Sequence, residues 1–155
     1  MSTGTNVYRT FEFTGDNIYV LGNIMSLVNF ALQLDSYSFN NLFKNCTNIV
    51  KIAETLLPAI NLGTYCYTHL FDGCTNLASI PENLLPATTL QQDCYSYIFA
   101  RTGLTEIPEN ILPKPVTYAN ECYRGMFAYT KITSIPEKLL SDKTTVTTGM
   151  CYAMF

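Results

Sequence analysis

The sequence predicts an α/β repeat fold, in which short parallel strands and short helical segments stack as the coils of a solenoid with a 28-residue period. Two observations carry this prediction. Five phenylalanines recur at a spacing of 28 residues, and further apolar columns keep the same spacing. A short apolar segment also recurs once in each period and is mostly followed by a proline. Self-similarity at a fixed period of roughly 20–50 residues is the signature of repeat proteins.

The repeated columns contain residue types that suit a core. The phenylalanine column is Phe43, Phe71, Phe99, Phe127 and Phe155. One cysteine column is Cys66, Cys94 and Cys122, followed directly by Tyr67, Tyr95 and Tyr123, and a second cysteine column is Cys46 and Cys74. The coil spacing of such a fold would allow disulfides within a column. Buried free thiols are the favoured interpretation, because Met150 and two threonines occupy equivalent column positions and cysteine packs well in cores.

Two elements are predicted in each coil. The segment Cys66–Phe71 places apolar residues at positions i, i+1, i+4 and i+5, which predicts one or two turns of helix with one buried face. The segment Leu77–Ile80, with counterparts at 49–52, 104–107 and 132–135, predicts one short strand per coil. A proline follows the strand in three of the four coils and is expected to end it, because proline has no N–H to donate.

The two ends of the chain differ from the repeat. Residues 1–35 are predicted to form a small β-rich N-terminal cap on a repeat region that spans 36–155, with about four repeats and the last one incomplete. Within the cap, Val7–Phe13 and Ile18–Leu21 around the turn at 14–17 predict a hairpin, and Ile24–Leu34 predicts a short helix or an irregular coil. Because the sequence stops at Phe155 within a unit, we expect either further coils or self-assembly through that uncapped end.

A specific motif runs through the repeat. The stretch Phe71-Asp-Gly-Cys-Thr-Asn-Leu-Ala-Ser-Ile80, matched by Phe43–Ile52, resembles the Phe-x-x-Cys-x-x-Leu-x-x-Ile core of BspA-like (treponemal-type) leucine-rich repeats. The resemblance covers roughly residues 36–155. It departs from the family pattern at Thr102 and Thr130, which replace the cysteine and leave a gap one residue shorter. The resemblance implies a leucine-rich-repeat solenoid of the kind found in bacterial surface adhesins and also in phages, without catalytic residues.

The candidate binding surface consists of two sets of side chains. One is an acidic line, Glu54, Glu82, Glu109 and Glu137, which is either a stripe for a cationic partner or a solvated edge. The other is a group of tyrosines outside the strict columns, Tyr65, Tyr97 and Tyr129, which suit contacts with a protein or glycan or are half-buried packing residues. The single histidine, His69, has no catalytic partner in the sequence, and no paired cysteines or histidine cluster indicates a metal. We expect no catalytic residues, no cofactor and no metal.

Composition narrows the function. The net charge is -3 and the nine basic residues are scattered, which argues against nucleic-acid binding. No apolar run is long enough to insert in a membrane, and the first residues do not form a signal peptide. The favoured function is a non-catalytic adhesion module of a bacterial surface protein that presents its repeats to a protein or glycan. The alternative is a structural phage or virion protein, such as a fibre or decoration component, so the expected location is the cell surface, the extracellular space or a virion.

Overall fold

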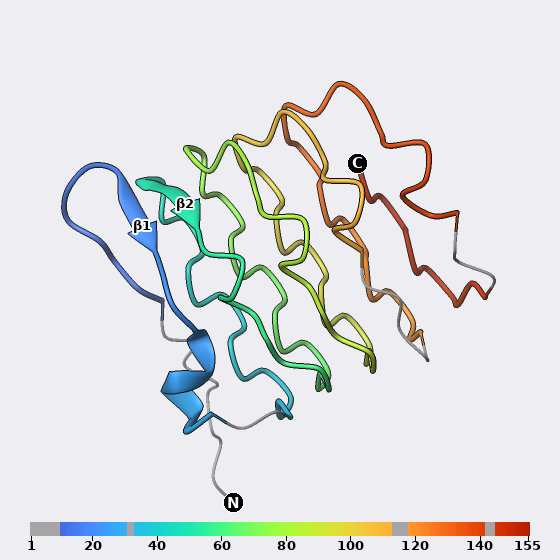
Figure 1. Cartoon of the computed structure of the whole chain (residues 1–155). Helices are drawn as coiled ribbons and strands as arrows, with labels where there is room; N and C mark the ends of the chain where they lie inside the picture. Colours follow the sequence, from blue (N-terminus) through green and yellow to red (C-terminus); the bar gives the residue numbers. More distant parts are fainter. Residues whose placement is uncertain (1–9, 31–32, 113–117, 142–144) are drawn as a thin grey trace, which may run out of the picture.

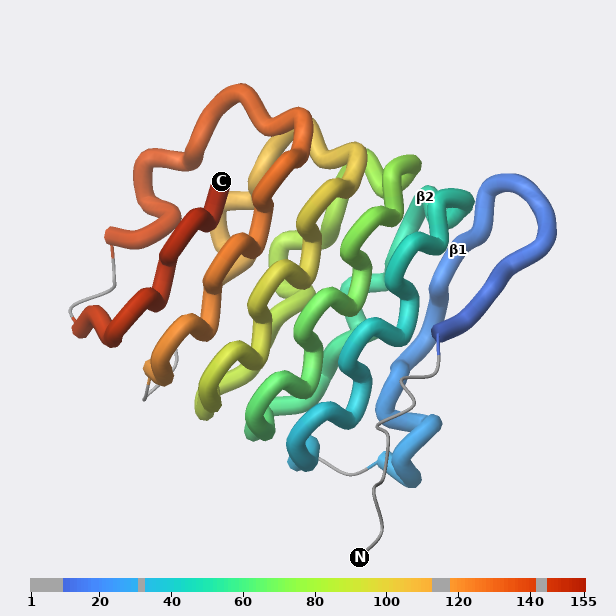
Figure 2. The backbone as a smooth tube through the Cα atoms, turned by 180° about the vertical axis from the view of Figure 1, so that it is seen from behind, coloured from blue at the N-terminus to red at the C-terminus, as the bar shows by residue number. Residues whose placement is uncertain are grey.

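Stacked coils dominate the architecture. The computed structural model describes residues 10–30, 33–112, 118–141 and 145–155. Regular secondary structure within these residues comprises strand β1 (Ile18–Val20), the 3-10 helix η1 (Ile24–Val28) and strand β2 (Ile49–Ile52). The remaining described chain winds in coils that lie side by side along one axis (Figures 1 and 2). The prediction of an α/β repeat solenoid is therefore wrong, because most coils contain neither a helix nor a strand.

Each coil contains a run of consecutive tight turns, which we call the turn ribbon. The ribbons are residues 35–46, 63–74, 91–102, 119–130 and 147–154. Along a ribbon, alternate N–H groups donate to the next coil, 27 residues further on, as Phe39 N does to Cys66 O at 2.9 Å. The N–H groups between them donate three residues back, as Leu42 N does to Phe39 O at 3.3 Å. Both sets of donors find partners, so the ribbons can be buried without forming a helix or a strand.

Left-handed residues recur at every fourth position of a ribbon. In the first ribbon Tyr37, Asn41 and Asn45 have φ angles of 63°, 61° and 62°. A left-handed non-glycine residue costs roughly 1–2 kcal/mol, so the hydrogen bonds between coils must hold these positions. A four-residue turn repeat brings apolar side chains inward at i, i+1, i+4 and i+5. The helix predicted for Cys66–Phe71 is wrong because this spacing fits the turn repeat as well as it fits a helix.

The strand prediction holds for one coil. Strand β2 pairs in parallel with β1, with Ile18 opposite Ile49 and Val20 opposite Ile52. In the described chain, no strand forms at 77–80, 104–107 or 132–135. The turn after Phe99 is one residue shorter than the turn after Phe71, which offsets 104–107 by one residue from 77–80. Segments 49–52 and 77–80 have no such offset, yet they do not pair either. The prolines that follow 77–80, 104–107 and 132–135 also remove N–H donors, so a ladder cannot extend across the stack.

The core is built from the repeated columns. Neighbouring phenylalanine rings stack nearly parallel, with centroid distances of 5.5 Å for Phe43–Phe71 and 5.8 Å for Phe71–Phe99. A buried tyrosine column runs beside it, with 5.9 Å between Tyr67 and Tyr95. The cysteines of both columns are buried and carry no disulfide, and they are Cys46, Cys66, Cys74, Cys94 and Cys122. Burial of these side chains is the main contribution to the stability of the fold.

The segment before the repeat lies over the first coil. Phe11 and Phe13 stack on Phe43 at centroid distances of 5.5 and 6.3 Å, and Phe11 N donates to Leu42 O at 2.8 Å. The predicted hairpin is wrong in its described part, because β1 pairs in parallel with β2 and residues 10–13 form no strand. Residues 7–9 of that hairpin lie outside the described chain. The helix expected within 24–34 is η1, and residues 31–32 are likewise outside.

Candidate binding surface

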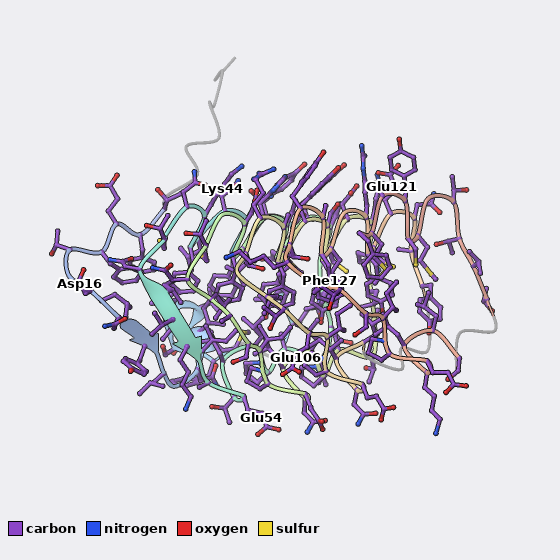
Figure 3. All side chains as sticks on the ribbon, turned by 90° about the horizontal axis from the view of Figure 1, so that it is seen from above. Asp16, Lys44, Glu54, Glu106, Glu121 and Phe127 are labelled. Carbon is purple, nitrogen blue, oxygen red and sulfur yellow. The ribbon has the colours of Figure 1, made fainter. Side chains whose placement is uncertain are left out.

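The two predicted halves of the binding surface lie on opposite edges of the stack. In Figure 3, Lys44 and Glu121 of the turn ribbons project from one edge and Glu54 projects from the other. Tyr65 and Tyr97 belong to turn ribbons, whereas the glutamates of the acidic line are exposed on the segments between ribbons. Among the ion pairs of the described chain, none involves Glu54, Glu82, Glu109 or Glu137. The structure therefore gives two separate surfaces, and the ribbon edge is the more organised of the two.

A stack of flat polar groups runs across the ribbon edge. The imidazole of His69 lies parallel to the ring of Tyr97, with centroids 4.9 Å apart and planes 5° apart. The guanidinium of Arg124 continues the stack, 5.9 Å from the Tyr97 centroid and 5.5 Å from that of Tyr152. We call these four side chains, together with the neighbouring stacked pair Tyr37 and Tyr65, the turn face. The stacked groups are partly exposed, although His69 Nδ1 faces Asp72 and Arg124 Nε is buried.

Glycine at position 125 makes room for this stack. A Cβ atom there would lie 2.2 Å from the Tyr97 ring, and Gly125 has a φ angle of +56°. Residue 125 occupies the column of Asn41, His69 and Tyr97, in which every member is left-handed. The absence of a side chain at Gly125 lets the Tyr97 ring lie flat over the neighbouring coil. Arg124, one residue earlier, can then reach the ring face.

A buried carboxylate holds the cations of this face. Asp72 has a fully buried side chain, and its Oδ2 lies 2.7 Å from His69 Nδ1, 2.5 Å from Arg101 Nη2 and 3.7 Å from Lys44 Nζ. The His69, Arg101 and Lys44 side chains come from three successive coils and remain partly exposed, with side-chain exposures of 27%, 46% and 31%. Because the negative partner is buried and the cations are not, the ribbon edge presents positive groups on a protein of net charge -3.

Arg124 is oriented in a similar way. Its Nη1 donates to Glu121 Oε2 at 2.6 Å. This hydrogen bond, followed by that with Tyr97, raises the pKa of the Arg124 guanidinium above its usual value. A charged hydrogen bond at one end and an aromatic face on each side fix a side chain that normally has many rotamers. Arg124 is therefore a preorganised donor at the centre of the turn face.

The tyrosines named from the sequence differ in their surroundings. Tyr65 stacks on Tyr37 with 5.0 Å between centroids, and the charge of Asp93 is the largest cause of its raised pKa. Tyr97 is half-buried within the stack described above. Tyr129 is 79% exposed and lies apart from that stack, where it lines a cavity of about 430 Å³ with Phe127 and Phe155. Two of the three tyrosines thus belong to the turn face.

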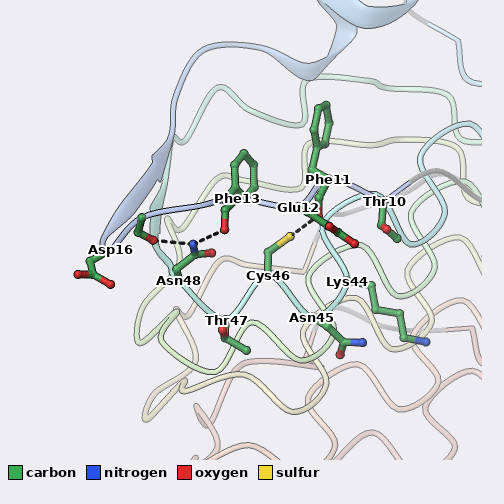
Figure 4. A pocket seen from close by; sticks show the side chains of 11 residues that line it. Thr10, Phe11, Glu12, Phe13, Asp16, Lys44, Asn45, Cys46, Thr47 and Asn48 are labelled. Atoms are coloured by element: carbon green, nitrogen blue, oxygen red, sulfur yellow. Dashed lines mark hydrogen bonds between the residues drawn. The ribbon is translucent and has the colours of Figure 1, made fainter.

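A cleft of about 570 Å³ separates the loop at 10–16 from the first coil (Figure 4). Its walls are joined by hydrogen bonds, from Cys46 Sγ to Phe11 O at 3.0 Å and from Asn48 Nδ2 to Phe13 O at 3.0 Å and Gly15 O at 2.7 Å. Burial, with a smaller contribution from Glu12, raises the pKa of the Cys46 thiol. A neutral thiol that donates to a carbonyl is a poor nucleophile, so this cleft reads as the junction between the first segment and the stack.

The other core thiols are also held in the neutral form. Burial raises the pKa of the Cys66 thiol to about 12 and that of Cys122 to about 12. The same cause raises the pKa of Cys74 and Cys94. Catalysis and metal binding use the thiolate, which these surroundings disfavour. The cysteine columns therefore act as packing groups.

The described residues give no sign of a metal site or a membrane-spanning helix, and comparisons with known proteins give no match. Within the described residues there is no group of three or more histidine, cysteine, aspartate or glutamate side chains arranged to hold a metal ion. The same residues include no helix with the length and apolar character needed to cross a membrane. No family model, no curated protein and no solved structure matches this chain. The resemblance to BspA-like repeats stays a prediction from the motif alone.

Sequence reasoning missed several members of this surface. The residues named from the sequence do not include Asp72, Arg101 or Arg124, and His69 was noted only as a single histidine without a catalytic partner. The four-residue spacing of turn positions could have found Arg101, because it places His69, Gly73, Tyr97 and Arg101 on one side of adjacent ribbons, but it includes neither Asp72 nor Arg124. That spacing becomes informative only once the segment is recognised as turns.

Proposed function

We propose that this chain is a non-catalytic binding module that presents its turn face to a protein or glycan ligand. The observation that carries the proposal is the stack of His69, Tyr97, Arg124 and Tyr152, whose planes are parallel or in cation–π contact. Binding loses less conformational entropy when the contacting side chains are already ordered. Tyrosine and arginine are also the residue types that dominate the energy of many interfaces.

The turn face is favoured over the acidic line because its side chains are held in place by more contacts. Asp72 and Glu121 hold His69 and Arg124 of the turn face through hydrogen bonds, and the absence of a side chain at Gly125 leaves room for the Tyr97 ring. The acidic line has one such contact, from Asn83 Nδ2 to Glu54 Oε1 at 3.0 Å, between exposed side chains. Exposed contacts of that kind contribute little. We therefore assign the main binding role to the ribbon edge.

The test is a binding screen with matched variants. The intact chain is measured by biolayer interferometry against immobilised neutral and acidic glycans and a set of extracellular-matrix proteins. We expect at least one binder whose affinity falls about tenfold or more in Tyr97→Ala and Arg124→Ala, as for interface hot spots. Glu82→Ala, on the opposite edge, is the control and should bind normally. Absence of any binder, or loss of binding in Glu82→Ala alone, would contradict the proposal.

A structural role in a phage or virion assembly is the second candidate. The observation that favours it is an exposed apolar cluster formed by Tyr129, Ile135 and Phe155 beside the 430 Å³ cavity. Exposed apolar patches are often interaction sites. Light scattering over a concentration series would show a defined oligomer that Phe155→Ser reduces to monomers. A monomer at every concentration would remove the support for self-assembly through this cluster.

A further inference from the structure

A polar groove crosses three successive coils beside the turn face. It has a volume of about 530 Å³ and is lined by residues 33–36, 61–64, 89 and 91. Gln33, Asn61 and Thr89 are joined by isolated parallel bridges, Gln33 to Asn61 and Asn61 to Thr89. The backbone bonds on either side, Leu34 N to Asn61 O and Leu62 N to Thr89 O, are both 3.0 Å. Partner residues in a parallel ladder direct their side chains to the same face, so these three form one column along the stack.

The floor of this groove is rigid. Gly63 packs its backbone directly on the preceding coil, where a Cβ atom would lie 2.6 Å from both Asp35 C and Leu34 O. Leu34 and Leu62 are buried beneath the surface and belong to the core. The groove is therefore part of the stacked framework, and its shape is set by contacts between coils.

The lining side chains are available to a ligand. Within the described part of the chain, the side chains of Gln33, Asn61, Thr64 and Gln91 make no hydrogen bond. Each amide offers two donors and a carbonyl acceptor, and each hydroxyl can both donate and accept. All four residues are at least partly exposed, so the groove presents unpaired donors and acceptors in adjacent coils. A ligand that both donates and accepts at each step would satisfy them.

The charge of the groove limits the ligand class. Asp35 is the one ionisable residue among its lining residues, so the groove has no cation to attract an anionic polymer. The basic side chains of Lys44 and Arg101 are not among the lining residues and contact Asp72 on the ribbons. Apart from the exposed Asp35 carboxylate, the accessible side chains of the groove are amides and hydroxyls, which match uncharged hydroxyl-bearing ligands better than apolar peptides. Tyr37 and Tyr65, whose rings stack on each other, directly follow the lining residues Ser36 and Thr64 in the sequence.

We propose that this groove is a binding subsite for an uncharged linear polysaccharide lying along the column of Gln33, Asn61 and Thr89. The inference rests on the proposed function as a binding module and names the ligand class for one part of its surface. Successive coils place equivalent groups about 4.8 Å apart, so a linear chain of sugars meets a donor–acceptor group at each coil. A polysaccharide that extends past Ser36 and Thr64 would next meet Tyr37 and Tyr65, whose rings can pack against the C–H groups of a sugar.

The test uses the full chain labelled with ¹⁵N and titrated with cellohexaose, chitohexaose, laminarihexaose and mannohexaose. An oligogalacturonate hexamer serves as the acidic comparison. We expect at least one neutral hexasaccharide to shift the side-chain amide signals of Gln33, Asn61 and Gln91. Asn61→Ala should weaken that binding about tenfold or more, since a lost hydrogen-bonding group in an ordered site has effects of this size. Asn110→Ala, an exposed asparagine away from the groove, should leave binding unchanged.

The outcomes separate this inference from the proposed function. Asn61 makes no side-chain hydrogen bond that folding requires, and an unchanged amide spectrum elsewhere will show that Asn61→Ala is folded. If no neutral hexasaccharide binds, or if the acidic hexamer alone binds, the groove proposal is overturned. If a saccharide shifts signals of Tyr97 and Arg124 and leaves Asn61 unaffected, the groove proposal is also overturned while the turn face keeps its role. The effect of Tyr97→Ala in the binding screen tests the turn face and does not bear on the groove.

Discussion

The imidazole of His69 and the ring of Tyr97 lie parallel on adjacent coils, 4.9 Å apart between centroids and 5° apart between planes. Both residues are left-handed, with φ angles of 57° and 54°, and they are 28 positions apart in sequence. This pair shows how the repeat makes a surface: one turn position, repeated in each coil, stacks its side chains in register. The turn face is a consequence of the same geometry that builds the core columns.

Gly125→Ala should destabilise the protein and displace Tyr97. The new methyl group would collide with the ring at 2.2 Å and would also occupy a left-handed position, which together should lower the free energy of unfolding by about 1–3 kcal/mol. Urea unfolding followed by circular dichroism measures the change. Gly149→Ala is the matched control, because its φ angle is +62° and its nearest neighbour is the flexible Glu121 side chain at 3.0 Å. Equal losses in both variants would mean that the Tyr97 contact is unimportant.

Asp72→Asn should be one of the most destabilising polar substitutions in the chain. The change leaves Lys44, His69 and Arg101 around a neutral group, with no buried carboxylate to hold them. Removing one partner of a buried ion pair costs several kcal/mol, and partial exposure of the cations reduces this to about 2 kcal/mol. Thermal and urea unfolding at low salt provide the measurement. Glu82→Gln, which has no ion pair, should change stability little, and a similar stability of the two variants would contradict the role of Asp72.

The core thiols should resist modification in the native protein. Cys66, Cys94 and Cys122 are fully buried, and burial raises their pKa values, whereas Cys151 is only half-buried. A thiol reagent at pH 8 followed by mass spectrometry should label Cys151 first and the three column cysteines only with unfolding. Full denaturation in urea is the control and should expose all six. Rapid native labelling of Cys94 would show that the column is open to solvent.

Stability should fall at alkaline pH. The thiols of Cys66 and Cys122 ionise with a pKa of about 12 in the fold, against 9.0 without it. A raised pKa means that the neutral form is favoured by folding, so the contribution is complete below pH 9 and is lost as the pH rises towards 12. The pH dependence of the urea midpoint between pH 8 and 11 tests this. Cys122→Ala should make the fall of the urea midpoint with pH less steep. Burial also raises the pKa values of Tyr67 and Tyr95, so these tyrosines should account for part of the remaining pH dependence. A flat midpoint across this range would contradict the burial of these groups.

The sequence predicted the period and the core better than the secondary structure. Phe71, Phe99, Tyr95 and Cys94 are buried in stacked columns, as their 28-residue spacing indicated. That spacing reports which side chains meet, and it does so whatever backbone conformation joins them. A helix and a run of turns with a left-handed residue every fourth position place apolar side chains in the same order, so the pattern of Cys66–Phe71 could not separate them.

The strands failed for a different reason. Leu77–Ile80 has the composition of a strand, yet it pairs neither with 49–52, which has the same spacing from its phenylalanine, nor with 104–107, which the shortening around Thr102 offsets by one residue. A Cβ atom at Gly103 would lie 2.4 Å from Thr75 O, so the backbones of the two coils pack closely at this turn. The threonine that replaces cysteine bonds locally, from Thr102 Oγ1 to Phe99 O at 2.8 Å, whereas Cys74 Sγ donates to Phe43 O of the preceding coil at 3.1 Å. The shortened turn could be seen in the sequence, but its effect on the register between neighbouring coils could not.

The binding surface was predictable only in part. Tyr65 and Tyr97 were identified because they lie outside the core columns, which correctly separated them from Tyr67 and Tyr95. Arg124 could not be found in this way, since its importance comes from a contact with a ring 27 positions away and from a hydrogen bond to Glu121. Contacts of this kind require the positions of the turns in three dimensions.

The most direct test of the account is the footprint of the tightest binder from the screen, measured by hydrogen–deuterium exchange of the intact chain. Free and bound samples are compared peptide by peptide. We expect added protection only in the turn ribbons at 63–74, 91–102 and 119–130 and in the adjoining groove residues, because the turn face and groove lie there. Protection concentrated instead at 77–86, 104–112 and 132–139, where the acidic line is exposed, would contradict the claim that the turn face is the binding surface.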